Sequence, residues 1–300
     1  METNTERFDR AAAILPVRLR RLALAVPEED RAKAEEIRLR AGRKLTVLLP
    51  EGEKELEATV EIQELETLCD LATDFSRYAA AETLRRGYIS VAGGFRVGLC
   101  GTAVMKEGTN TNLKDLSSAA IRIGREQKGI GMEVAAGLFQ EGRYQNALLL
   151  SPPGGGKTTL LRDLVRILSD GLGVPRMRVA LIDERGEVAV MHRGEAQMDV
   201  GARTDVLDAC PKALGIPMVL RAMNPQLIAV DEITAREDIR SMTMAAGCGV
   251  GLLATIHGGT VEELREKPLY RELLETKVFS RAVCIRREGT ARRYDVEDLL

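Results

Sequence analysis

The chain has 300 residues, of which 45% are hydrophobic and only 3% aromatic, with 43 Lys and Arg against 45 Asp and Glu. This length suffices for about two domains, and the balanced charge and absent Trp disfavour bulk nucleic-acid binding and a base-stacking platform. Five scattered cysteines without a CxxC pair predict reduced thiols in a cytosol. Because no apolar run reaches the roughly 18 to 20 residues of a membrane span, we expect a cytoplasmic protein whose membrane association, if any, is peripheral.

The first part of the chain mixes helical and strand patterns. In order, the patterns predict helices broken by Pro16 and Pro27 over residues 1–40 with Gly42 as a cap, a strand at 45–49, a helix at 61–80, a hairpin at 88–103, an exposed loop at 106–116 and a strand at 118–123. We therefore expect an α+β N-terminal domain over residues 1–124, followed by a linker over 125–145.

From residue 146 onward, apolar strands alternate with helices. The strands are expected at 147–150, 179–182, 227–230 and 251–256, and the helices at 157–169 and 236–246. Thr260 and Glu263 form a capping-box pattern before a short helix, and the last twenty residues predict a strand, a turn at Glu288-Gly289 and a second strand. This alternation predicts a mostly parallel sheet in an α/β domain over residues 146–300.

The segment SPPGGGKTT at 151–159 lies between an apolar strand and an amphipathic helix. A phosphate-binding loop needs glycines where backbone amides approach the anion, a lysine for the β and γ phosphates, and a hydroxyl for Mg²⁺ where the helix begins. The residues expected to bind ATP are Gly154, Gly155, Gly156, Lys157, Thr158 and Thr159. Ser151 departs from the standard pattern, which has Gly there. The strand-loop-helix context favours a nucleotide site over a surface turn that ends in Lys-Thr.

Two of the apolar strands end in an Asp-Glu pair, at 183–184 and at 231–232. Nucleotide hydrolysis needs a carboxylate at a neighbouring strand end to hold Mg²⁺, and commonly a glutamate that orients the attacking water. We favour Asp231 together with Thr158 for the metal and Glu232 for catalysis. Glu184 is kept as a second catalytic candidate.

His257 ends another apolar strand, in ATIHG at 254–258. Ligands bind at that end of the strands in open α/β sheets, so we expect His257 to act at the γ-phosphate, whereas His192 has no such context. Arginines supplied by a neighbouring subunit often stabilise the transition state. The candidates, none of which the sequence singles out, are Arg96, Arg122, Arg125, Arg185, Arg203 and Arg221.

The order of these motifs, with LIDERGE at 181–187 between the phosphate loop and LIAVDE at 227–232, resembles the secretion-ATPase superfamily of type II and type IV secretion and pilus-retraction motors. More narrowly, EIRLRAG at 36–42, GYISVAGGFRVGLCG at 87–101 and IRIGRE at 121–126 resemble the stage III sporulation protein AA family. The resemblance spans nearly the whole chain. By motif, Lys157 and Thr158 look like Walker A residues, Asp183, Glu184 and Glu187 like the Asp box, Asp231 and Glu232 like Walker B, and His257 like the His box.

The resemblance implies a RecA-like P-loop ATPase core behind a smaller α+β N-terminal domain, assembled as a homo-oligomer, a hexameric ring with ATP at its subunit interfaces. It also implies a Mg²⁺-dependent ATPase in the mother-cell cytoplasm. There it would associate with membrane proteins of the stage III sporulation complex and energise a transport channel between mother cell and forespore. The tetracysteine site of some secretion ATPases is missing from this sequence, which disfavours a structural zinc.

Two alternatives stay open at this point. A nucleotide-gated assembly factor would bind ATP, form a ring and recruit membrane partners with little turnover. A nucleic-acid-binding ATPase would use the arginine-rich stretches at 18–21 and 38–44, but neither contains an aromatic residue for stacking, and a solvated surface is the commoner role of such stretches. The sequence therefore carries no strong nucleic-acid signal.

Overall fold

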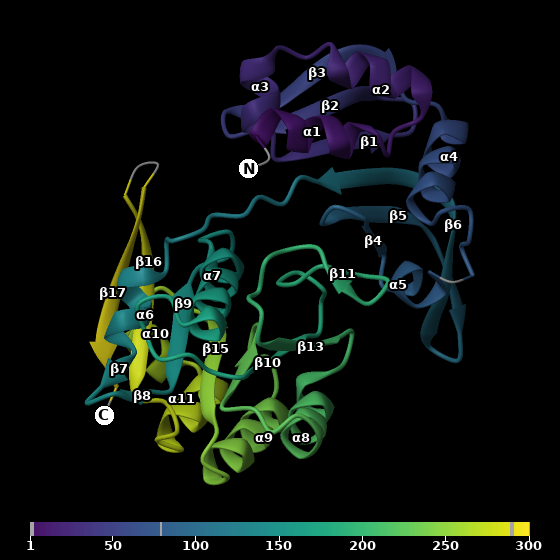
Figure 1. The fold of residues 1–300 in the computed structure, drawn as a ribbon. Helices are drawn as coiled ribbons and strands as arrows, with labels where there is room; N and C mark the ends of the chain where they lie inside the picture. Colours follow the sequence, from purple (N-terminus) through teal and green to yellow (C-terminus); the bar gives the residue numbers. More distant parts are fainter. Residues whose placement is uncertain (1–2, 79, 289–290, 300) are drawn as a thin grey trace. The chain divides into compact units, whose positions relative to one another are not determined.

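The computed structural model describes residues 3–78, 80–288 and 291–299 (Figure 1). The chain divides into two compact units, the first formed by Met1–Arg125 with Val190–Gln197 and the second by Glu126–Ala189 with Met198–Leu300. The segment expected as a linker is thus part of the second unit from residue 126 onward, and residues 190–197 leave the C-terminal part of the chain to join the first unit. Within the described residues, no helix is both long and apolar enough to span a membrane.

The first unit is built on an antiparallel sheet, six-stranded in the part of the chain that is described, with the order β3-β2-β1-β6-β5-β4. Its strands are β1 (Glu36–Arg40), β2 (Lys44–Leu49), β3 (Gly52–Thr59), β4 (Tyr88–Val91), β5 (Phe95–Lys106) and β6 (Thr109–Arg122), and its helices are α1 (Asn4–Ala12), α2 (Val17–Leu24), α3 (Glu28–Lys33), α4 (Ile62–Ala72) and α5 (Ala81–Arg85). A short hairpin of β11 (Met191–His192) and β12 (Glu195–Ala196) belongs to the same unit.

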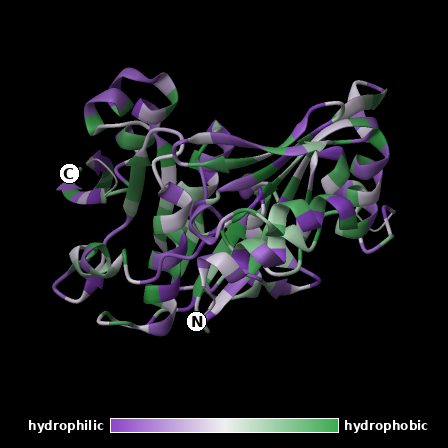
Figure 2. Ribbon diagram, turned by 90° about the horizontal axis from the view of Figure 1, so that it is seen from above, coloured by the Kyte–Doolittle hydropathy of each residue, from purple (hydrophilic) through white to green (hydrophobic). Residues whose placement is uncertain are grey.

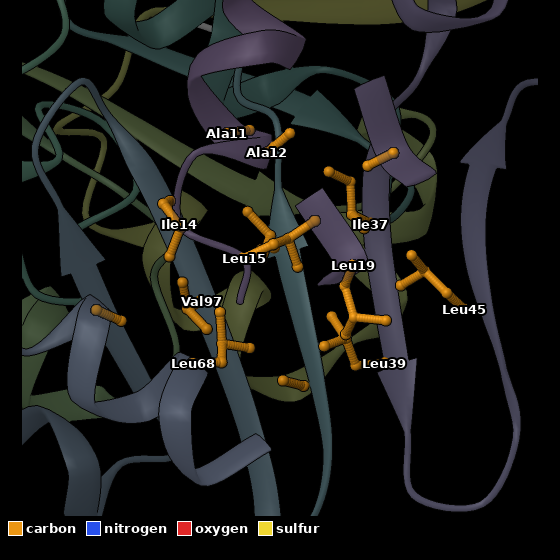
Figure 3. Close-up of a cluster of buried hydrophobic side chains, with 14 of the residues drawn as sticks. Ala11, Ala12, Ile14, Leu15, Leu19, Ile37, Leu39, Leu45, Leu68 and Val97 are labelled. Atoms are coloured by element: carbon orange, nitrogen blue, oxygen red, sulfur yellow. The ribbon is translucent and has the colours of Figure 1, made fainter. Parts of the chain in front are cut away.

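The core of this unit lies on one face of the sheet. Ile37 and Leu39 of β1 are fully buried, whereas Arg38 between them and Arg40 after them are only half-buried, as the period of two in a strand requires. Figure 3 shows Leu15 and Leu19, from the N-terminal helical segment, pointing towards Ile37 and Leu39. Burying each such side chain contributes roughly 1.5–3 kcal/mol. The helices are therefore held to the sheet by an apolar layer.

Three predictions in this unit are wrong. Glu36–Arg40 forms a strand and not a helix, because it pairs with both β2 and β6, and Gly42 (φ +69°) turns the chain between strands. Residues 106–116 are not a loop, since β5 and β6 pair out to Lys106 and Thr109 around a two-residue turn. That extension is polar and mostly exposed, so it lacks the apolar alternation that marks a strand. The helix expected at 61–80 ends at Ala72.

The second unit contains a sheet that, among the described residues, has seven strands in the order β13-β10-β14-β15-β9-β16-β17. The strands are β9 (Ala147–Ser151), β10 (Val179–Asp183), β13 (Thr204–Asp208), β14 (Leu227–Val230), β15 (Gly251–His257), β16 (Arg281–Glu288) and β17 (Ala291–Asp298). All neighbours are parallel except β16 and β17, which confirms the expected mostly parallel sheet. Of the predicted turn between β16 and β17, Gly289 lies outside the described residues.

The helices of this unit are α6 (Met132–Gly137), α7 (Lys157–Asp170), α8 (Lys212–Ala222), α9 (Arg236–Gly247), α10 (Val261–Glu266) and α11 (Pro268–Glu275), with a small pair β7 (Phe139–Gln140) and β8 (Arg143–Tyr144). Four central strands, β9, β10, β14 and β15, are buried almost throughout. Figure 2 shows hydrophobic residues gathered on the strands, with hydrophilic residues striping the helices. The charged and polar residues that could bind a ligand or take part in chemistry lie at the carboxyl ends of these buried strands.

Candidate nucleotide-binding site

The phosphate loop joins β9 to α7. Gly154 (φ +74°) and Gly156 (φ +102°) adopt left-handed backbone conformations that residues with a Cβ rarely tolerate. Residue 155 has another reason to be glycine, because an added Cβ would overlap the Ser151 hydroxyl, which donates to the Pro152 carbonyl at 2.9 Å. The standard loop has glycine at position 151. Here the Ser151 side chain occupies the space that a side chain at position 155 would need. The N–H groups and the dipole at the start of an α-helix such as α7 favour an anion at this position.

Lys157 is buried at the start of α7. Its ammonium donates to the carbonyl of Ser151 at 2.8 Å and contacts Nδ1 of His257 at 2.9 Å. Burial lowers its pKa, and the charges of Glu232 and Asp231 act in the opposite direction. An ammonium can only donate, so Nδ1 of His257 accepts and the ring proton lies on Nε2.

That Nε2 lies 2.8 Å from a carboxylate oxygen of Glu232. Glu232 is also paired with Arg185 at 3.1 Å. The structure therefore joins Lys157, His257, Glu232 and Arg185 in one polar chain across the ends of α7, β15 and β14. Glu232 itself has φ +26°, a sparsely populated conformation of the kind that clusters at functional sites.

Asp231 and Thr158 face each other, with the Thr158 hydroxyl 3.5 Å from a carboxylate oxygen of Asp231. The other carboxylate oxygen accepts from the hydroxyl of buried Thr255 at 2.8 Å and from the Glu232 N–H at 3.0 Å. Oxygen ligands of this kind suit Mg²⁺, which is usually held by one or two carboxylates together with phosphates and water. Two protein oxygens, from Thr158 and Asp231, fit a metal whose remaining ligands are phosphate and water.

The other Asp-Glu pair is engaged differently. The carboxylate of buried Asp183 accepts N–H bonds from Glu187, Val188 and Ala189 at 2.9 to 3.0 Å, and burial raises its pKa while these bonds oppose the shift. Glu184 forms a close ion pair with the buried Lys212 of α8. Asp183 therefore organises its own loop. The structure brings Glu232 and His257 to Lys157, whereas the contact it gives Glu184 is with Lys212.

The remaining predicted residues are dispersed. Thr159 follows on α7 and lines a small crevice with Asp163, while Arg125 donates to the carbonyls of residues 33 and 34. Arg96 and Arg122 belong to the first unit, where they line a cavity of about 330 Å³. The structure adds partners that sequence patterns did not reveal. These are Thr255, Lys212 and Arg292, the last of which donates to the Gly155 carbonyl.

Solved structures of similar fold include the ATPase DotB of Legionella pneumophila (TM-score 0.57, 15% identity, 88% of this chain and 76% of that chain). Another is the pilus retraction motor PilT with bound ADP (TM-score 0.59, 17% identity, 88% and 79%). The fold is therefore that of the RecA-like P-loop secretion ATPases, as expected. The chain belongs to the family described as "Sporulation stage III, protein AA", whose model matches residues 5–295. The stage III sporulation protein AA of Bacillus subtilis is 34% identical over 271 residues, 90% of this chain and 88% of that protein.

Proposed function

We propose that this chain is a Mg²⁺-dependent ATPase that energises a transport channel between mother cell and forespore during sporulation. The observation that supports it best is the polar chain from Lys157 through His257 to Glu232, beside the Thr158–Asp231 pair. Phosphate donors, metal ligands and a water-orienting carboxylate meet at one edge of the sheet. This is the set of groups that phosphoryl transfer needs.

Each residue takes a definite part in this proposal. Backbone N–H groups of the phosphate loop and the ammonium of Lys157 bind the polyphosphate of ATP. Thr158 and Asp231 would hold Mg²⁺, which neutralises charge that develops on the phosphate oxygens. Glu232 orients the attacking water. His257 contacts both Lys157 and Glu232, so it positions the carboxylate according to where the lysine ammonium lies.

The assembly and location follow the same proposal. Likeness to motors of the secretion-ATPase class and membership of the sporulation family support a homo-oligomeric ring, a hexamer, in the mother-cell cytoplasm. The ring would attach peripherally to membrane proteins of the stage III sporulation complex.

The test is steady-state ATP hydrolysis, run beside sedimentation with and without ATP and Mg²⁺. We expect Glu232→Gln to bind ATP and form the ring while losing turnover by about 10²-fold or more, because it removes the water-orienting carboxylate. The turnover of Glu184→Gln, measured in the same assay, shows which of the two Asp-Glu pairs supplies the catalytic carboxylate. Glu237→Gln, an exposed position five residues beyond Glu232, is the matched control and should turn over normally.

The outcomes separate the candidate functions. A wild-type chain that forms a ring on ATP without turnover, unchanged in Glu232→Gln, would replace the motor with a nucleotide-gated assembly factor. The structure does not favour a nucleic-acid-binding ATPase, because one cation in each arginine-rich stretch is paired with a carboxylate, Arg18 with Glu64 and Arg40 with Glu53. Salt-sensitive DNA binding would restore it.

A further inference from the structure

The C-terminal hairpin brings a basic residue to the phosphate loop. β16 runs parallel to β9, from Arg281 beside Ala147 to Cys284 beside Leu150. β9 ends at Ser151, where the phosphate loop begins, whereas β16 continues to Glu288 and returns as β17 from Ala291. The first residues of β17 therefore lie beyond the end of β9, level with the phosphate loop.

Arg292 is the second residue of β17, and its side chain contacts this loop directly. Its Nε donates to the carbonyl oxygen of Gly155 at 3.0 Å. A Cβ added to Gly156 would lie 2.7 Å from the same Nε and 3.1 Å from Cζ. The guanidinium therefore lies against the backbone of the two glycines that precede Lys157. A side chain at position 156 would occupy the space that the guanidinium fills.

The hydrogen bond reaches a peptide group of the phosphate loop. The Gly155 carbonyl and the Gly156 N–H belong to one peptide unit, and N–H groups of this loop are the donors to the phosphates. A charged donor on the carbonyl polarises the peptide, and such cooperative strengthening is about 10–30% per bond. Arginine stays protonated at any working pH, so both the polarisation and the charge are permanent.

We propose that Arg292 is a positioning residue of the nucleotide site, which holds the phosphate loop by the Gly155 carbonyl and stabilises the bound polyphosphate through its charge. This inference rests on the proposed function. It assigns to the C-terminal hairpin, which lies after the last of the four motifs along the chain, a part in nucleotide affinity.

The test is the dissociation constant for ATP and for ADP, measured calorimetrically at two salt concentrations. For Arg292→Gln we expect binding of ATP to weaken roughly three- to tenfold, the effect of removing one charge that acts across a single peptide group in a mostly hydrated setting. The loss should be smaller for ADP, which carries less charge, and smaller at high salt, because salt screens an exposed charge. Arg292→Lys should retain most of the affinity.

Arg293→Gln is the matched control, since it removes the same charge one residue further along the strand, where Arg293 pairs with Asp295 at 2.7 Å. We expect it to bind ATP as the wild type does. Equal ATP affinity in Arg292→Gln and wild type would refute the role of Arg292 and leave the proposed function standing. An equal loss in the Gln and Lys variants, without altered salt dependence, would refute the charge role. A wild-type chain that binds no ATP would refute both proposals.

Discussion

The fit between Ser151 and Gly155 allows a graded test of the phosphate loop. Gly155 has no left-handed φ, so alanine is compatible with its backbone, and the obstacle to Gly155→Ala is the Ser151 side chain. The added Cβ would overlap Oγ and lie 2.9 Å from the Cβ of Ser151 and 3.1 Å from the carbonyl oxygen of Pro152. Overpacking of this kind costs about 1–3 kcal/mol. If the loop absorbs that cost by moving, ATP affinity should fall roughly five- to 150-fold.

Removing the obstacle should restore binding in two steps. Ser151→Ala removes the hydroxyl but leaves the 2.9 Å contact with Cβ, whereas Ser151→Gly removes both and leaves the Pro152 carbonyl oxygen at 3.1 Å. ATP affinity measured by calorimetry should therefore rank Gly155→Ala lowest, its combination with Ser151→Ala higher, and its combination with Ser151→Gly highest. Because the two residues touch, the effects should not be additive. Full ATP affinity in Gly155→Ala alone, or no recovery in either double variant, would refute the reasoning.

Three further predictions concern stability, measured by urea unfolding. Burial lowers the pKa of Lys157, so the unfolded chain holds this proton more tightly than the folded chain does. The free energy of unfolding should therefore rise as pH rises from that lowered pKa towards about 10.4. The same slope of unfolding free energy against pH in Lys157→Met would contradict this. Arg162→Ala should lower the free energy of unfolding by about 1–3 kcal/mol, because Arg162 donates to the carbonyls of Glu187 and Val188. A loss of stability under about 0.5 kcal/mol would argue against that role. Leu39→Ala should cost roughly 2–5 kcal/mol while leaving ATP affinity of the folded protein unchanged.

The second unit was largely predictable because its signals are local. Strands buried on both faces read as short apolar runs, and parallel strands bring their carboxyl ends to one edge, so Lys157, Glu232 and His257 could be placed together from sequence. In the first unit, EIRLR of β1 fits both helix and strand periods, and pairing with β2 and β6 decides between them. That decision depends on partners distant in sequence.

The site contacts that were missed share one physical cause. Thr255 bonds Asp231, Lys212 pairs with Glu184 and Arg292 bonds the Gly155 carbonyl, each through tertiary structure. Lys212 and Arg292 lie outside any motif, and the ATIHG segment that contains Thr255 does not by itself indicate its partner. Glu184 shows the converse, since its sequence context matches that of Glu232, yet Lys212 binds it. A strand-end carboxylate is defined by what the neighbouring element brings to it, and no spacing rule within one segment contains that information.

The membership of residues 190–197 in the first unit has a topological consequence. The chain passes between the two units after Arg125, after Ala189 and again after Gln197, and the hairpin is tied to the first unit by a 2.7 Å ion pair between Arg193 and Asp74 and by the Gly93 N–H bond to Gln197. No single cut in the backbone separates the units. A protease that cuts near residue 125 would leave the two fragments associated, because residues 190–197 of the C-terminal fragment belong to the first unit. A gene fragment that stops at residue 125 would lack this hairpin of the first unit.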